Sequence, residues 1–130
     1  MTKMQIMDDA RWVALKETSL AERVADPRFQ FGAEDYAYIE SRGMSLLKTH
    51  VLDFVRRRLA PASPKNEGRQ TPLRGHPVFL AQHATGTHSR RSIQELYEIP
   101  VGRQMTPDEV DFIVAIIFRW IDEQVASRPE

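Results

Sequence analysis

Cysteine is absent from the 130-residue sequence, so the chain forms neither a disulfide framework nor a thiolate metal site. Long apolar runs are absent too, and none approaches the roughly 20 residues that a membrane-spanning helix requires. The N-terminal region carries Asp8 and Asp9 and lacks the basic and then apolar pattern of a secretion signal. These absences predict a cytoplasmic protein of bacterial type.

The sequence also lacks net charge, because 18 basic residues balance 18 acidic residues. The balance is uneven along the chain, however. Residues 1–41 hold 5 basic and 8 acidic residues, residues 42–103 hold 11 and 4, and residues 104–130 hold 2 and 6. A basic middle between acidic ends indicates either an anionic partner, such as a nucleic acid or a phosphate-bearing ligand, or neutralisation within the molecule.

What is present is the composition of a globular protein, with 42% hydrophobic and 28% charged residues. The length suits one domain over residues 1–130, of which we expect residues 1–9 to be weakly ordered. Apolar residues recur at helical spacing, and no strand pattern occurs. We therefore expect a mainly α fold, a compact bundle of about five or six helices. One or two short helices are expected within residues 9–24, and one helix each within residues 33–41, 44–59, 77–85, 87–97 and from 107 onward.

The C-terminal helix has the clearest signals. Thr106 is a suitable N-cap, Pro107 suits the first turn, and Glu109 follows the cap by three residues, as in a capping box. Apolar residues then cover most of the circumference, which is typical of a helix at the centre of a core. They are Val110, Phe112, Ile113, Val114, Ile116, Ile117, Trp120, Ile121 and Val125.

A long Pro/Gly-rich loop is expected over residues 60–74, where Pro61, Pro64, Gly68 and Pro72 interrupt any regular pattern. Loops longer than about 12 residues are uncommon in small domains and are often functional. This loop leads into residues 74–91, which hold three of the four histidines. The candidate binding residues lie in this segment and just beyond it: Arg74, His76, Gln82, His83, Thr87, His88, Arg90, Arg91 and Gln94.

Metal binding is one hypothesis for His76, His83 and His88. Within one helix, His76 and His83 would stand about 10 Å apart along the axis, which is too far for a shared ion. His83 and His88 flank Gly86 and could converge, but the sequence shows no third ligand and no known metal motif. We predict neither a metal nor a cofactor.

Catalysis is a second hypothesis, in which a histidine acts as general base. His88 precedes Ser89, yet adjacent side chains seldom point together, and no Gly-x-Ser-x-Gly elbow is present. A small enzyme that uses the histidines therefore remains an alternative and not the main prediction.

Nucleic-acid binding is a third hypothesis, because residues 77–97 read as a helix-turn-helix-like pair. Its second helix would present Arg90, Arg91 and Gln94, whose side chains suit phosphate and base-edge contacts. Both halves are about one residue longer than the usual spacing of this motif. The neutral chain also differs from most DNA-binding domains, which are basic.

The fourth hypothesis is structural. His76 would anchor the start of the helix at residue 77. Gln82, His83 and Thr85 would satisfy backbone groups of the long preceding loop, since buried polar groups need partners.

Several stretches together resemble a bacterial family that is catalogued only as a domain of unknown function. The resemblance runs from about Phe29 to the final helix and centres on the motif RGHPVF-x-AQHAT. It is carried by residues 58–61, 64–66, 68, 70–72, 74–79 and 81–85. It implies a small bacterial domain and no activity.

One departure from that family changes the expected chemistry. The resemblance implies cysteines at the positions of His88, Ser89 and Ser92, and a Trp-His pair at Leu96 and Tyr97. His88 could replace one ligand, but two serines do not replace soft thiolates. We therefore expect a binding or interaction module that uses the basic middle segment, without a membrane role and with its oligomeric state left open.

Overall fold

The computed structural model describes residues 7–64 and 71–128, and within these ranges the chain is helical and contains no strand. The mainly α fold expected from the sequence is thus confirmed. The described residues form seven α-helices and one π-helical turn. They are α1 (Asp9–Glu17), α2 (Ala21–Ala25), α3 (Ala33–Arg42), α4 (Met44–Phe54), η1 (Val55–Leu59), α5 (Pro77–Ala84), α6 (Arg90–Tyr97) and α7 (Pro107–Ala126).

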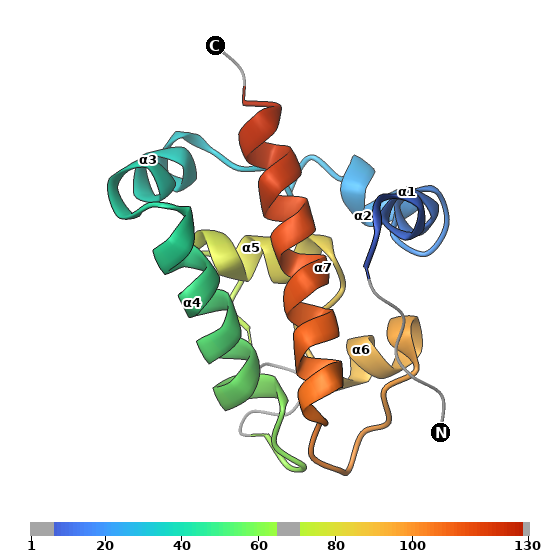
Figure 1. Cartoon of the computed structure of the whole chain (residues 1–130). Helices are drawn as coiled ribbons and strands as arrows, with labels where there is room; N and C mark the ends of the chain where they lie inside the picture. The colour runs from blue at the N-terminus through green and yellow to red at the C-terminus, as the bar shows by residue number, and fades with distance from the viewer. Residues whose placement is uncertain (1–6, 65–70, 129–130) are drawn as a thin grey trace.

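Helix α7 is the longest element and lies at the centre of the arrangement (Figure 1). Helix α4 runs beside it, α5 crosses behind it, and α1 and α2 lie on its other flank. The expected capping box is present: Thr106 Oγ1 accepts from the Glu109 N–H, and the Glu109 carboxylate accepts from the Thr106 N–H. Two otherwise unpaired donors are thereby satisfied, which fixes where α7 begins.

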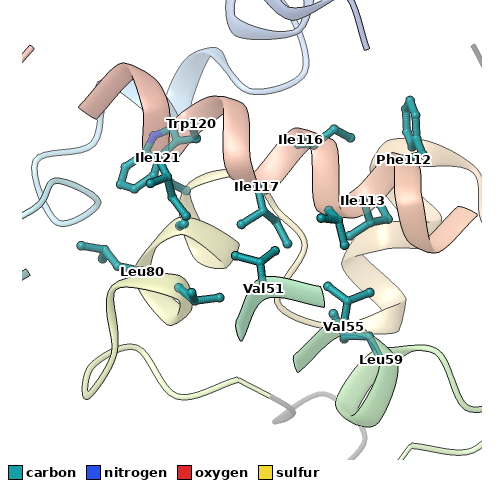
Figure 2. Close-up of a cluster of buried hydrophobic side chains, with 14 of the residues drawn as sticks. Val51, Val55, Leu59, Leu80, Phe112, Ile113, Ile116, Ile117, Trp120 and Ile121 are labelled. Carbon is teal, nitrogen blue, oxygen red and sulfur yellow. The ribbon is translucent and has the colours of Figure 1, made fainter. Parts of the chain in front are cut away.

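The core lies between α7 and the pair formed by α4 and α5. Figure 2 shows Val51, Val55 and Leu59 facing the Ile113 and Ile117 side of α7. All five side chains are fully buried. Burying such apolar surface is the main favourable contribution to folding. The apolar spacing of residues 44–59 therefore correctly predicted a buried stripe of side chains.

The described chain has seven α-helices, because residues 9–25 form two, α1 and α2, which is the larger of the two numbers that the spacing there allowed. One local detail differs from the expected helices. Residues 44–59 do not form one regular helix, because the last turn widens. The Ala60 N–H donates to the Val55 carbonyl, five residues earlier, which is the bond of a π turn.

Helix α5 is buried almost all round and not on one side only. Every residue from Pro77 to Gln82 is buried, as is Ala84, and His83 is the one partly exposed residue of the helix. The sequence had indicated a short helix with one buried side. The position of α5 between α7, α4, α3 and α2 explains the difference.

Parts of two expectations lie outside the described residues: residues 1–6 of the weakly ordered start and residues 65–70 of the long loop. Asp8 caps α1 by accepting from the Arg11 N–H, and α1 begins at Asp9. Residues 60–64 and 71–76 contain no helix. Within the described ranges, no helix is both long and apolar enough to cross a membrane.

Candidate functional site

His76 is the N-cap of α5. Its backbone is extended, with φ of −165°, and its Nδ1 accepts from the Val78 N–H at 3.1 Å. Pro77 occupies the first helical position, where a missing N–H costs nothing. This places the His76 ring at the start of α5, as the structural hypothesis expected for this residue.

The other ring nitrogen of His76 joins a network that the sequence did not indicate. His76 Nε2 lies 3.0 Å from the Tyr38 hydroxyl of α3, and the same hydroxyl lies 3.2 Å from Nδ1 of His50 in α4. The three side chains come from positions 12 and 26 residues apart, so no sequence spacing pointed to them. His50 stood alone in an amphipathic helix without any motif around it.

Two aromatic rings and two arginines surround this network. The His76 ring centroid lies 5.2 Å from that of Phe54 and 5.7 Å from that of Phe79. The Arg58 guanidinium lies 5.0 Å from both phenyl rings. The Arg42 guanidinium lies 5.6 Å from the Tyr38 ring centroid. Such cation–π contacts hold arginine side chains flat against aromatic faces.

We call this group of residues the His50–His76 surface: Tyr38, Arg42, His50, Phe54, Arg58 and His76. Arg42 is exposed, and the other five are partly exposed. Burial, together with the nearby His50 and Arg58, lowers the pKa of His76 to about 4. The imidazole of His76 is therefore neutral at pH 7.

A second pair of histidines lies at the far end of α5. The rings of His83 and His88 stack with centroids 4.4 Å apart and an interplanar angle of 19°, and Phe29 stacks on His83 at 6.3 Å. His83 Nε2 donates to the Thr71 carbonyl at 3.0 Å, so His83 bonds the preceding loop. The Arg23 guanidinium donates to the His83 carbonyl.

The stacked pair does not have the geometry of a metal site. The lone pair of an imidazole nitrogen lies in the plane of its ring, and the planes of His83 and His88 run almost parallel. Two such lone pairs point side by side and do not meet at one ion. No group of three or more His, Asp or Glu residues in the described ranges is arranged to hold a metal.

Ser89 does not serve as a nucleophile beside His88 in this arrangement. It is 5% exposed, and its hydroxyl accepts from the Ser92 N–H as the N-cap of α6. Nδ1 of His88 is buried without a hydrogen-bond partner. The pairing of a base with a neighbouring nucleophile, which the sequence already disfavoured, is therefore not formed.

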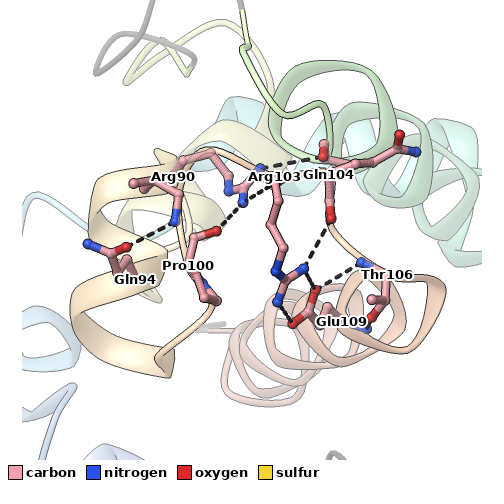
Figure 3. Close-up of polar contacts among 9 residues, drawn as sticks. Arg90, Gln94, Pro100, Arg103, Gln104, Thr106 and Glu109 are labelled. Atoms are coloured by element: carbon pink, nitrogen blue, oxygen red, sulfur yellow. Dashed lines mark hydrogen bonds and ion pairs between the residues drawn. The ribbon is translucent and has the colours of Figure 1, made fainter.

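The expectation that α6 presents Arg90 at the surface is wrong. Arg90 is 1% exposed. Its guanidinium donates to five backbone carbonyls at 2.6–3.4 Å, two of which are drawn in Figure 3. They belong to Leu59, Ala60, Pro61, Pro100 and Arg103. Arg90 thus joins the end of η1 to the segment before α7.

Other candidate residues are also used internally. Gln82 and Thr87 are fully buried, and the Gln82 amide donates to the Thr87 carbonyl. The side-chain oxygen of Gln94 accepts from the Val101 N–H. Of the basic candidates, Arg74 and Arg91 are exposed.

The helix-turn-helix hypothesis loses its main support from these positions. The outward face of α6 offers one basic residue, Arg91, together with the acidic Glu95, and Glu98 follows at the helix end. A recognition helix needs several donors that reach base edges and phosphates. Residues 77–97 do form two helices joined by a Gly86 turn, but the second helix lacks that face.

A cleft of about 540 Å³ lies beside the start of α5, between residues 27–35, which include the first turn of α3, and residues 73–76. Exposed Arg74 and partly exposed His76 line one side of it, and Leu80 lines its apolar part. The cleft and the His50–His76 surface therefore meet at His76.

The fold and its sites define a small helical protein organised around a buried, histidine-capped helix. The chain belongs to the family described as a domain of unknown function, DUF4186, whose sequence profile matches residues 11–122. The match begins further toward the N-terminus than the resemblance at Phe29 suggested. No solved structure matches the chain.

Proposed function

We propose that this protein is a binding module for an anionic, phosphate-bearing partner, and that the partner binds at the His50–His76 surface. The supporting observation is the pattern of donors at this surface. In the hydrogen-bond network, Nδ1 of each imidazole is already occupied by a neighbouring group and is closed to a ligand. Two guanidinium groups flank the network. Groups that only donate favour ligands that only accept, and phosphate oxygens are such ligands.

The arginines of this surface are not neutralised by neighbouring carboxylates. Within the described ranges, neither Arg42 nor Arg58 forms an ion pair. Arg57, next to Arg58, forms an ion pair with Asp53 at 2.9 Å. The charge of Arg42 and Arg58 is therefore available to an anion from solution.

This assignment keeps the basic middle segment as the binding region and changes the element that carries it. Arg42, His50 and Arg58 all lie within residues 42–103, which hold 11 basic and 4 acidic residues. The hydrophobic and aromatic part of the surface, Phe54 and Tyr38, adds ring faces on which a base or another planar group can stack.

The test compares two arginine substitutions with a matched control. Affinity for a labelled single-stranded oligonucleotide and for inorganic triphosphate is measured at low salt for wild type, R42A/R58A and R91A. Loss of two charge-assisted contacts is expected to weaken binding about tenfold or more, and binding is expected to fall steeply with added salt. R91A, which removes an exposed arginine of α6, is expected to change affinity less than about twofold.

The two probes separate the sources of the phosphate group. Binding of triphosphate alone indicates a small ligand, whereas much tighter binding of the oligonucleotide indicates a nucleic acid. A larger loss of affinity in R91A than in R42A/R58A contradicts the proposal and indicates that the binding site lies on α6. Absence of any binding at low salt also contradicts it.

A further inference from the structure

We propose that His50 recognises the anion directly, donating from its Nε2–H to an oxygen of a phosphate-class oxyanion, and that Tyr38 and His76 are positioning residues that hold His50 in the required tautomer. This inference rests on the proposed function and assigns the individual donor. It follows from the direction of three consecutive hydrogen bonds, which are traced from a donor whose identity is certain.

The first bond starts at a backbone amide, which only donates. The Val78 N–H donates to Nδ1 of His76, so Nδ1 carries no proton. A neutral imidazole carries one proton, which must then be on Nε2 of His76. The structure places that nitrogen 3.0 Å from the Tyr38 hydroxyl. His76 therefore donates to the oxygen of Tyr38.

The second step concerns the one proton of the Tyr38 hydroxyl. Because His76 donates to this oxygen, the hydroxyl cannot donate back to His76. The remaining neighbour is Nδ1 of His50, at 3.2 Å, so the hydroxyl donates there. Nδ1 of His50 is then an acceptor and carries no proton, so the ring proton is on Nε2. The other neutral tautomer would leave the Tyr38 hydroxyl proton without this acceptor.

The third step concerns where the proton on Nε2 of His50 can go. No bond in the described ranges uses this nitrogen, and it is not one of the buried polar atoms that lack a partner. His50 is partly exposed, so Nε2–H is open to solvent. A chain of bonds that all run the same way polarises its last donor, which strengthens the bond that this donor forms.

The neighbours of His50 also favour an oxyanion. The Arg58 guanidinium lies against Phe54, whose ring is 6.2 Å from that of His50, and Arg42 lies against Tyr38. Asp53 lies on the same helix as His50, but its carboxylate is paired with Arg57. The surface thus combines an imidazole N–H donor with two guanidinium cations, a set that suits the oxygens of a phosphate group.

The experiment follows the histidine nitrogens during a titration with inorganic phosphate. Long-range ¹H–¹⁵N correlation spectra assign the tautomer of each histidine in wild type, Y38F and H50L. We expect wild-type His50 to be the Nε2–H tautomer and its Nε2 signal to shift with added phosphate. We expect H50L to bind phosphate about tenfold more weakly, the effect of losing a hydrogen bond to a charged group.

The Y38F variant tests the positioning role. Without the hydroxyl, His50 is expected to populate both neutral tautomers and to bind phosphate a few times more weakly, on the order of threefold. The matched control is Y36F, since the Tyr36 hydroxyl donates to the Gln124 carbonyl of α7 and to no residue of this surface. Y36F is expected to leave the His50 spectrum and phosphate affinity unchanged.

The outcomes separate this inference from the proposed function. If R42A/R58A weakens phosphate binding but the His50 signal does not move and H50L binds like wild type, His50 is not the donor and the binding function stands. If wild type binds neither phosphate nor triphosphate, the proposed function itself fails. If Y38F loses affinity while His50 keeps a single Nε2–H tautomer, Tyr38 contacts the anion itself and the positioning role is overturned. Because the wild-type spectra decide the tautomer, the inference stays testable even if a variant does not fold.

Discussion

The imidazole rings of His83 and His88 lie face to face, with centroids 4.4 Å apart. Burial, then the neighbouring His83 and the Arg23 guanidinium, lower the pKa of His88 to about 4. Burial also lowers the pKa of His83. The stacked pair is therefore suited to neutral imidazoles. A proton on either ring is repelled by the Arg23 guanidinium, and two protonated rings would repel each other.

Acid is expected to destabilise the protein before its carboxylates titrate. In the unfolded chain, histidines take up protons at their ordinary pKa of about 6.5, whereas His76 and His88 do so in the folded protein only at about 4. Between these values the unfolded state binds more protons, so the free energy of unfolding falls as pH falls through this window. Since both groups are half-buried, we expect a loss on the order of 1 kcal/mol per pH unit for the two together.

Urea unfolding between pH 7 and pH 4.5 measures this dependence. H88L removes one of the two groups and is expected to flatten the slope by about half, relative to wild type. A free energy of unfolding that stays constant from pH 7 to pH 4.5 would show that the folded histidines take up protons as readily as the unfolded ones.

Replacing Arg90 by methionine is expected to destabilise the fold by about 3–5 kcal/mol, because buried carbonyls then lose their donor. Five carbonyls from two segments accept from this guanidinium. The Arg103 side chain in turn pairs with Glu109 of the α7 capping box, as Figure 3 shows. R90K is expected to recover little, since one ammonium cannot span both segments.

The adjacent Arg91 supplies the control for that measurement. It is exposed, and R91M is expected to change the free energy of unfolding by less than about 0.5 kcal/mol. Equal effects of R90M and R91M on the urea midpoint would show that the buried bonds of Arg90 do not stabilise the fold.

Gly86 is expected to tolerate no side chain. Its φ is +68°, and a Cβ there would lie 2.1 Å from Cδ1 of Leu96. We expect G86A to cost about 3 kcal/mol, from the left-handed backbone and from overpacking together. Gly102 has φ of +86° with nothing within 4 Å of its Cβ position, so G102A is expected to cost only about 1 kcal/mol. Thermal unfolding of both variants separates close packing from backbone conformation, and equal costs would contradict the close approach to Leu96.

Removing the N-cap of α7 is expected to cost about 1 kcal/mol. T106A leaves the Glu109 N–H without the acceptor it has in the wild type at 3.1 Å. The matched substitution T49A removes a hydroxyl that bonds its own helix backbone at an exposed position, and it is expected to change stability by less than about 0.5 kcal/mol. A T106A effect no larger than that of T49A would mean that packing alone positions α7.

Helix positions were predictable wherever the signals lie within a few residues of each other. The Thr106–Glu109 box, Pro77 at the start of α5 and the apolar spacing of residues 44–59 depend on neighbours three to five residues away. The role of His76 as an anchor could also be inferred, because it directly precedes that proline. The π turn at Val55–Leu59 could not, since its residues suit an α-helix equally well.

The binding residues could not be predicted from such local signals. The helix-turn-helix hypothesis places Arg90 on an exposed helix face, as is usual for charged residues, yet Arg90 is buried and bonded internally, and so are the candidates Gln82 and Thr87. Tyr38, His50 and Arg58 were not chosen, because they stand outside the histidine-rich segment. Their sequence neighbours give no sign that they meet.

The sequence by itself determined the helical class, most helix boundaries and the lack of thiolate chemistry, because these follow from local spacing and from residue types. The tertiary structure alone decided which polar groups face one another. Packing α3, α4 and α5 together places Tyr38 between His50 and His76, and the end of η1 and the segment before α7 surround the Arg90 guanidinium with backbone carbonyls. A buried polar group takes whatever partner the packing brings within reach, and that partner can be dozens of residues away along the chain.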